Sequence, residues 1–283
     1  MNRLLCVFII VLNTGCGLRG QLKVITDMPS RLTEISGLAK FDDASVWVIE
    51  DRGNGNNIYK VDLNGNMLRK LEVKNAKNHD WEDLTTDKEG NLFIGDFGNN
   101  KNDRKNLRIY KLQNPELEKG DKIESHRIWF HYPEQEEFPP IKSERNYDAE
   151  AFFHFKQHLY IFTKNRADPF TGETLIYRIP AVKGNYIATL MGTIKTCEDW
   201  DTCQITSAAI SPNGKTVVLL GYGKLWTITD FIDDAFIKGK LSEIDLGIRT
   251  QLESVCFKDE TTLLLSDEIR NKEGGYLYSY KLN

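Results

Sequence analysis

The strongest constraint on the fold is an internal repeat that recurs five times along the chain. Each unit opens with an acidic or small polar residue, a small residue and an apolar residue. A turn, a short apolar strand, a polar loop and an alternating strand then follow in the same order. The opening segments are 34–38, 81–84, 149–152, 206–209 and 252–255. Self-similarity of this kind predicts an architecture made of one supersecondary unit used many times.

The pattern within each unit favours β-structure. Segments such as 46–49 and 58–61 are rich in β-branched and aromatic residues, and helical periodicity is weak. The first four units also contain candidates for a fourth strand, at 67–73, 124–132, 188–195 and 242–246. Four short strands per unit predict an all-β fold, a β-propeller with five blades.

The two ends of the chain predict how the ring closes. The fifth unit ends at Asn283 without a fourth strand, whereas the strand at 22–26 has no unit of its own. Pairing residues 22–26 with residues 276–281 would complete the last blade and leave no half-built sheet edge. Six blades would require irregular strands in 231–239, a segment that resembles a short helix more than a blade.

The N-terminal segment predicts export. Residues 1–15 contain Arg3 and an apolar run too short to span a bilayer, as in a signal peptide. Gly15 directly before Cys16 resembles a bacterial lipoprotein signal, which implies lipidation of Cys16, a tether over 16–21 and a propeller domain over 22–283. A plain signal peptide cut near Gly17 is the alternative. Both place the protein in the cell envelope, in the periplasm or, through the lipid anchor, on the outer membrane.

The remaining cysteines and the net charge restrict the chemistry further. Cys197 and Cys203 close a small polar loop, which in an oxidising compartment indicates a disulfide, whereas a metal pair would lack further ligands. Cys256 alternates with apolar residues and is expected to be a packing residue. A net charge of −4 without a basic patch argues against a nucleic-acid partner.

Propeller geometry predicts an acidic cluster at one mouth of the central channel, because every inner strand starts there. The inner strands contribute Glu34, Glu82, Glu150 and Glu253, with Ser207 in the fourth unit. The ends of the second strands add Asp51, Asp96, Lys164 and Asp267. Converging carboxylates repel one another and require cations, raised pKa values or hydrogen-bond donors.

Two interpretations of this cluster remain open. The four glutamates would be metal ligands, with Ca²⁺ as the natural hard cation for oxygen donors. Alternatively, they brace neighbouring blades through backbone N–H groups or nearby arginines such as Arg52 and Arg270. Lys164, Arg166 and Arg145 are candidate contacts for an anionic ligand.

Several motifs carry a resemblance to known families. Glu-Ile-Ser-Gly-Leu at 34–38, Trp-Val-Ile-Glu-Asp-Arg at 47–52 and Asp-Trp-Glu-Asp-Leu at 80–84 resemble the SdiA-regulated family of extracytoplasmic propellers. Leu-Ser-Asp-Glu at 265–268 is similar to the family named for an esterase-like activity of phytase. The resemblance implies a secreted or lipoprotein propeller and calcium-dependent phosphoesterase chemistry at the acidic mouth. The fourth unit departs from it, with Ser207 in place of Glu.

Other catalytic patterns are missing from the sequence. It has no Gly-x-Ser-x-Gly motif, and its five histidines lack triad or zinc spacing. We therefore expect a binding or interaction module for an unidentified protein or small-molecule ligand. The alternative is a Ca²⁺-dependent phosphoesterase or a lactonase-like hydrolase, for which no catalytic residue can be named.

Overall fold

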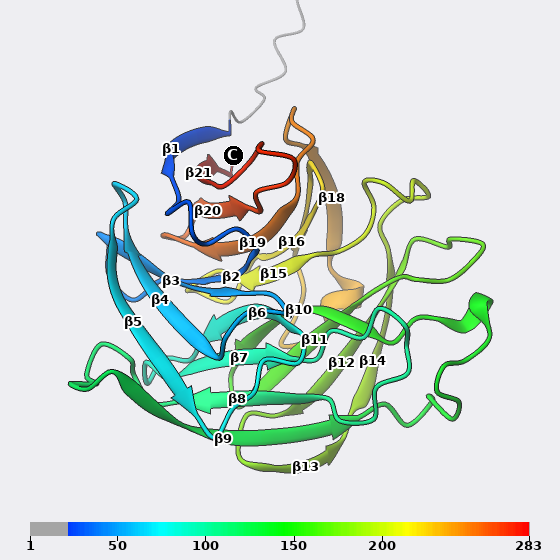
Figure 1. Cartoon of the computed structure of the whole chain (residues 1–283). Coiled ribbons are helices and arrows are strands. Elements are labelled where there is room, and N and C mark those ends of the chain that lie inside the picture. Colours follow the sequence, from blue (N-terminus) through cyan, green and yellow to red (C-terminus); the bar gives the residue numbers. More distant parts are fainter. Residues whose placement is uncertain (1–21, 283) are drawn as a thin grey trace, which may run out of the picture.

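The computed structural model describes residues 22–282, so the predictions for the signal segment and for Cys16 lie outside the described residues. The chain forms an all-β propeller, as predicted, in which four-stranded units are arranged around a central axis, the axis of the channel (Figure 1). No helix among the described residues is long and apolar enough to cross a bilayer.

The antiparallel pairings of the described strands fall into five groups of four, which we call blades 1 to 5, and the parallel pairing of β5 with β9 joins the first two groups into one sheet. Blade 1 contains β2 (Ile35–Ala39), β3 (Ser45–Glu50), β4 (Asn57–Asp62) and β5 (Met67–Lys74). Blade 2 contains β6 (Trp81–Thr86), β7 (Leu92–Asp96), β8 (Arg108–Leu112) and β9 (Lys122–His131). Blade 3 contains β10 (Asp148–Phe155), β11 (His158–Lys164), β12 (Glu173–Pro180) and β14 (Thr189–Lys195). Blade 4 contains β15 (Ser207–Ile210), β16 (Val217–Gly221), β17 (Lys224–Thr229) and β18 (Lys240–Asp245).

Blade 5 combines both ends of the chain. It contains β19 (Leu252–Phe257), β20 (Thr262–Asp267), β21 (Tyr276–Lys281) and β1 (Lys23–Asp27). β1 pairs antiparallel with β21, with Lys23 opposite Ser279 and Asp27 opposite Tyr276. The predicted closure of the last blade by the N-terminal strand is confirmed.

The inner strands β2, β6, β10, β15 and β19 pack in that order around the channel, and β19 returns to β2 (Figure 1). The segment 231–239 holds the 3-10 helix η2 (Phe236–Lys238), and the insertion before blade 3 holds η1 (Lys142–Glu144). Outer strands also link blades: β5 pairs parallel with β9, and β13 (Gly184–Ile187) pairs parallel with β9.

The hydrophobic core lies between adjacent blades. Each of five buried clusters combines residues from two neighbouring blades. Trp47 of blade 1 and Trp81 of blade 2, for example, share one cluster and are fully buried. Because each blade buries its faces only against its neighbours, the ring must close for every core to be complete.

Cys197 and Cys203 form a disulfide between β14 and β15, with Cα atoms 5.4 Å apart, as predicted. Cys256 is a free thiol that is half-buried, and it packs partly against the core between blades 5 and 1.

Candidate functional site

The inner strands of four blades each contain a β-bulge near their first residue. The register shifts occur at Ser36, Glu82, Glu150 and Glu253. A bulge inserts one unpaired residue and redirects its side chain. Three of the four predicted glutamates therefore occupy equivalent bulge positions and are buried at the start of their strands.

Glu34 does not share this position. In blade 1 the bulge is Ser36, and Glu34 precedes β2 as an exposed residue that accepts a hydrogen bond from Asn54 Nδ2 (2.7 Å). Asp80 and Asp148 lie two residues before the bulges of blades 2 and 3, just as Glu34 lies two residues before Ser36. Blades 2 and 3 therefore carry an acid at both positions, whereas the repeat pattern predicted one acid per blade.

The aspartates at the ends of the second strands divide into two groups. Glu50, Asp96 and Asp267 pair with the first residues of their inner strands, so Asp51 is equivalent to Glu268 and not to Asp267. Successive side chains of a strand point to opposite faces. Asp51 lies one residue further along its strand than Asp96 and Asp267 do, so its side chain points to the opposite face.

Asp96 and Asp267 are held by structural partners. The carboxylate of Asp96 contacts Arg104 (3.1 Å) and Arg108 (2.9 Å). Asp267 accepts hydrogen bonds from Thr250 Oγ1 (2.7 Å), the Tyr276 amide (2.8 Å) and Tyr278 Oη (2.8 Å). Both carboxylates are fully buried and serve as braces.

Asp51, Asp80 and Glu82 form the most compact acidic group, which we call the carboxylate triad. One oxygen from each lies within 4.8 Å of the other two. Asp80 is 4% exposed, and its Oδ1 has no hydrogen-bond partner among the described residues. Its nearest cation is Arg52, whose Nε is 3.7 Å away on a largely exposed side chain. Gly98 makes this packing possible, because a Cβ there would collide with the carboxylates of Asp80 and Glu82.

Burial and mutual repulsion raise the pKa values of the triad. Burial, with the charges of neighbouring carboxylates such as Asp148 and Asp96, raises the pKa of Asp80 to about 6. Burial, together with Asp80 and Glu150, raises the pKa of Asp51 to about 7. The pKa of Glu82 is also raised by burial and by the surrounding carboxylates. A bound cation would remove this penalty by favouring the charged forms.

The opposite side of the mouth is braced by cations. Lys164 Nζ lies 3.2 Å from Glu150 Oε2, and Arg166 Nη2 lies 3.0 Å from Glu150 Oε1. Tyr222 accepts a hydrogen bond from Lys164 (3.1 Å) and donates one to Glu253 (2.9 Å). Three of the four glutamates predicted as metal ligands, namely Glu34, Glu150 and Glu253, thus have protein partners, whereas Glu82 belongs to the triad.

Arg145 lies apart from this network. Its Nε donates to the carbonyl of Pro140 (3.4 Å), and its own carbonyl accepts from the Arg166 amide (2.9 Å). Of the three predicted anion contacts, Lys164 and Arg166 line the acidic mouth.

The mouth also contains four residues that were not among the predicted site residues. They are Asp80, Asp148, Tyr222 and Glu268. Burial and neighbouring acids, chiefly Glu253, raise the pKa of Glu268 to about 9. The recurring Asp-x-Glu of 80–82 and 148–150 is a signal that could have identified both aspartates.

A buried layer closes the channel below the mouth. The Oδ2 of Asp83 accepts hydrogen bonds from the Phe152 amide (3.2 Å), Ser207 Oγ (3.1 Å) and the Ala208 amide (3.4 Å). Ser207 Oγ in turn accepts one from the Val255 amide (3.1 Å). Ser207 therefore lies in this layer with Asp83, and not among the acids of the mouth where the repeat pattern placed it.

Fold and site together define a β-propeller with an acidic group at one end of its channel. No family model matches the chain, and no curated protein matches it. Among solved structures, the PQQ-bound form of an aldose sugar dehydrogenase from Streptomyces coelicolor is 12% identical, with a TM-score of 0.54 over 93% of this chain and 98% of that chain. A structural genomics protein of unknown function from Bacteroides thetaiotaomicron is 9% identical, with a TM-score of 0.48 over 92% of this chain and 75% of that chain. The dehydrogenase shares the propeller fold, and at this identity the likeness concerns the fold alone.

Proposed function

We propose that the protein is an exported, lipid-anchored binding module of the cell envelope, and that a hard divalent cation at the carboxylate triad forms its ligand site. The signal-like residues 1–15 and Cys16 support export and anchoring. The Cys197–Cys203 disulfide is compatible with an oxidising compartment. One observation carries the proposal for the site: Asp80 Oδ1 is buried without a hydrogen-bond partner among the described residues, next to two further carboxylates.

The charge balance of the mouth supports a cation. Carboxyl groups outnumber the positive side chains that contact them. The carboxyl groups are Asp51, Asp80, Glu82, Asp148, Glu150, Glu253 and Glu268. The cations that contact them are Arg52, Lys164 and Arg166. Because Lys164 and Arg166 are engaged by Glu150 and Asp148, the triad retains a local excess of negative charge.

The donor set fits a hard cation. Carboxylate oxygens are the ligands that Ca²⁺ and Mg²⁺ prefer, and Ca²⁺ takes about six to eight of them. Three protein carboxylates would leave coordination positions for oxygens of a ligand. Lys164 and Arg166 line the same mouth, and a negatively charged group of such a ligand would share them with Glu150 and Asp148.

A second candidate is a metal-dependent hydrolase of the phosphoesterase or lactonase type. A bound cation can act as a Lewis acid toward a phosphoryl or carbonyl oxygen. In the metal-free protein the pKa of Glu268 is raised to about 9, so this carboxyl can hold a proton at the mouth at neutral pH. The resemblance to the phytase-like family agrees with this candidate.

Calorimetric titration of the EDTA-treated protein with CaCl₂ and with MgCl₂ tests the proposal. The wild type should bind one of these ions, and the Glu82→Gln variant should bind it at least roughly tenfold more weakly, because a charged ligand is lost. Glu137→Gln is the matched control, since Glu137 is exposed and outside the mouth. Equal affinities of the two variants, or no binding by the wild type, would contradict a cation site at the triad.

The same samples distinguish the two candidates. Hydrolysis of p-nitrophenyl phosphate or of a simple lactone that requires the ion, and that is lost in Glu82→Gln, would support the hydrolase. Ion binding without hydrolysis of either compound supports the binding module.

A further inference from the structure

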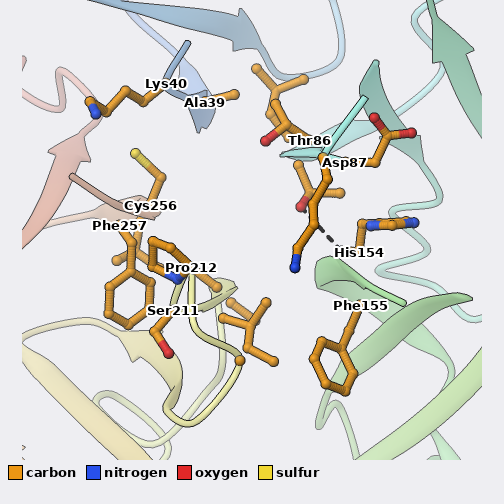
Figure 2. Close-up of a pocket in the computed structure, with 18 of the residues that line it drawn as sticks. Ala39, Lys40, Thr86, Asp87, His154, Phe155, Ser211, Pro212, Cys256 and Phe257 are labelled. Atoms are coloured by element: carbon orange, nitrogen blue, oxygen red, sulfur yellow. Dashed lines mark hydrogen bonds between the residues drawn. The ribbon is translucent and has the colours of Figure 1, made fainter. Parts of the chain in front are cut away.

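A second cavity occupies the opposite end of the channel. It has a volume of about 710 Å³, and all five blades line it. Figure 2 shows Lys40 of blade 1, Asp87 of blade 2, Phe155 of blade 3, Pro212 of blade 4 and Phe257 of blade 5 around this opening. We call it the basic cavity. The buried layer of Asp83 and Ser207 separates it from the acidic mouth.

The inner walls of the basic cavity are apolar. Leu38, Leu84, Ala208 and Val255, all from inner strands, are lining residues with at most 2% exposure. The rings of Phe155, Phe257 and Pro212 also line the cavity (Figure 2). Such walls favour a ligand with an apolar body, because its burial removes apolar surface from water.

The rim of the same cavity is basic. Four lysines line it, at positions 40, 88, 156 and 258, against Asp87 and Glu89. Asp87 already accepts hydrogen bonds from Asn91 and lies 3.5 Å from Lys111 Nζ, so it offers little charge to the cavity. This basic rim stands out on a chain whose net charge is −4.

Two of these lysines have ammonium groups that form no salt bridge within residues 22–282. Lys40 pairs with Asp43 (2.8 Å) and Lys156 pairs with Asp233 (2.9 Å). Lys88, on the blade 2 turn, is exposed, and Lys258, at the end of β19, is half-buried. The rim therefore retains two cations for a ligand from outside the chain, against the single exposed carboxylate of Glu89.

From this arrangement we propose that the basic cavity binds a small amphiphilic anion, with its apolar body between the inner strands and its anionic group at Lys88 and Lys258. The charge of the rim and the apolar walls select such a ligand together. A cavity of this size falls within the range of about 300–1,000 Å³ that is common for small-molecule sites. This site is separate from the carboxylate triad and does not depend on the function proposed for it.

Calorimetry with two probes of opposite charge tests the proposal. The purified protein should bind decanoate and should bind decylammonium at least roughly tenfold more weakly, because the rim is cationic. Affinity should increase by roughly tenfold for each two carbons from hexanoate to decanoate, as expected for burial of the chain. A protein that binds neither probe, or both equally, overturns the proposal.

The double variant Lys88→Gln/Lys258→Gln locates the binding. It should weaken decanoate binding roughly tenfold and preserve the chain-length dependence. Lys70→Gln/Lys119→Gln is the control, because both residues are exposed, carry the same charge and do not line the cavity. Equal losses in the two double variants would place the anion elsewhere on the surface and overturn the proposal. Melting curves establish that both variants are folded. Decanoate binding by the wild type should strengthen at a reduced concentration of salt, because its contact with the lysines is electrostatic.

Discussion

Replacing Asp80 with Asn should stabilise the metal-free protein at neutral and alkaline pH. The carboxyl of Asp80 is 4% exposed, and its Oδ1 lacks a hydrogen-bond partner among the described residues. Its pKa is raised from 3.8 to about 6, chiefly by burial. A carboxyl that holds its proton more tightly in the folded state loses stability as pH rises between these two values. The penalty is fully present above pH 6 and absent below pH 4.

The shift of about two pH units corresponds to ~3 kcal/mol above pH 6, as an upper limit, because the group is coupled to its neighbours. Asn has nearly the same shape without the charge, so we expect Asp80→Asn to raise the free energy of unfolding by ~1–3 kcal/mol at pH 8 in EDTA. Urea unfolding at pH 4 and pH 8 provides the measurement. At pH 4 the two proteins should be nearly equal.

Added Ca²⁺ should reverse this order. A cation bound only to the folded state stabilises the wild type by a few kcal/mol at saturation, and it should stabilise Asp80→Asn much less. A variant that is less stable than the wild type at pH 8 in EDTA would refute the reasoning, since Asp80 would then be a brace. A gain in stability of the same size at pH 4 and pH 8 would refute it as well.

Three further predictions concern the framework. Asp267→Asn should destabilise the protein by ~2–3 kcal/mol in urea unfolding, because this buried carboxylate accepts three hydrogen bonds; an unchanged midpoint would contradict its role as a brace. Replacing Cys197 and Cys203 with Ser should cost ~2 kcal/mol for so short a loop, whereas free thiols in non-reducing mass spectrometry of the exported protein would contradict the disulfide. Deleting residues 22–27 should lower the melting temperature of the whole ring in one cooperative transition, and a separate early transition would show that blade 5 unfolds alone.

The fold was largely predictable from the sequence, because the strands and turns repeat and each blade must bury its faces against the next. The unpaired strand at 22–26 and the incomplete last unit together predicted the closure now seen between β1 and β21. Burial of a blade face and pairing of a sheet edge depend on whole strands. An error of one or two residues in a predicted strand boundary therefore does not change the predicted closure of the ring.

The site was only partly predictable, because it depends on single-residue register. Glu82 lies in the carboxylate triad, but the repeat alignment of Asp51 with Asp96 and Asp267 missed a shift of one residue, which places the Asp51 side chain on the opposite side of its strand. The β-bulges that direct Glu82 toward the channel have no distinct sequence signature here. Burial, which raises the pKa of Asp80, is a property of the assembled ring.

Anomalous diffraction from crystals grown with CaCl₂ tests the central claim most directly. We predict a single ordered ion coordinated by carboxylate oxygens of Asp51, Asp80 and Glu82 at ~2.3–2.6 Å. A well-ordered mouth without an anomalous peak at saturating Ca²⁺, or an ion bound only at Glu150 and Glu253, would contradict it.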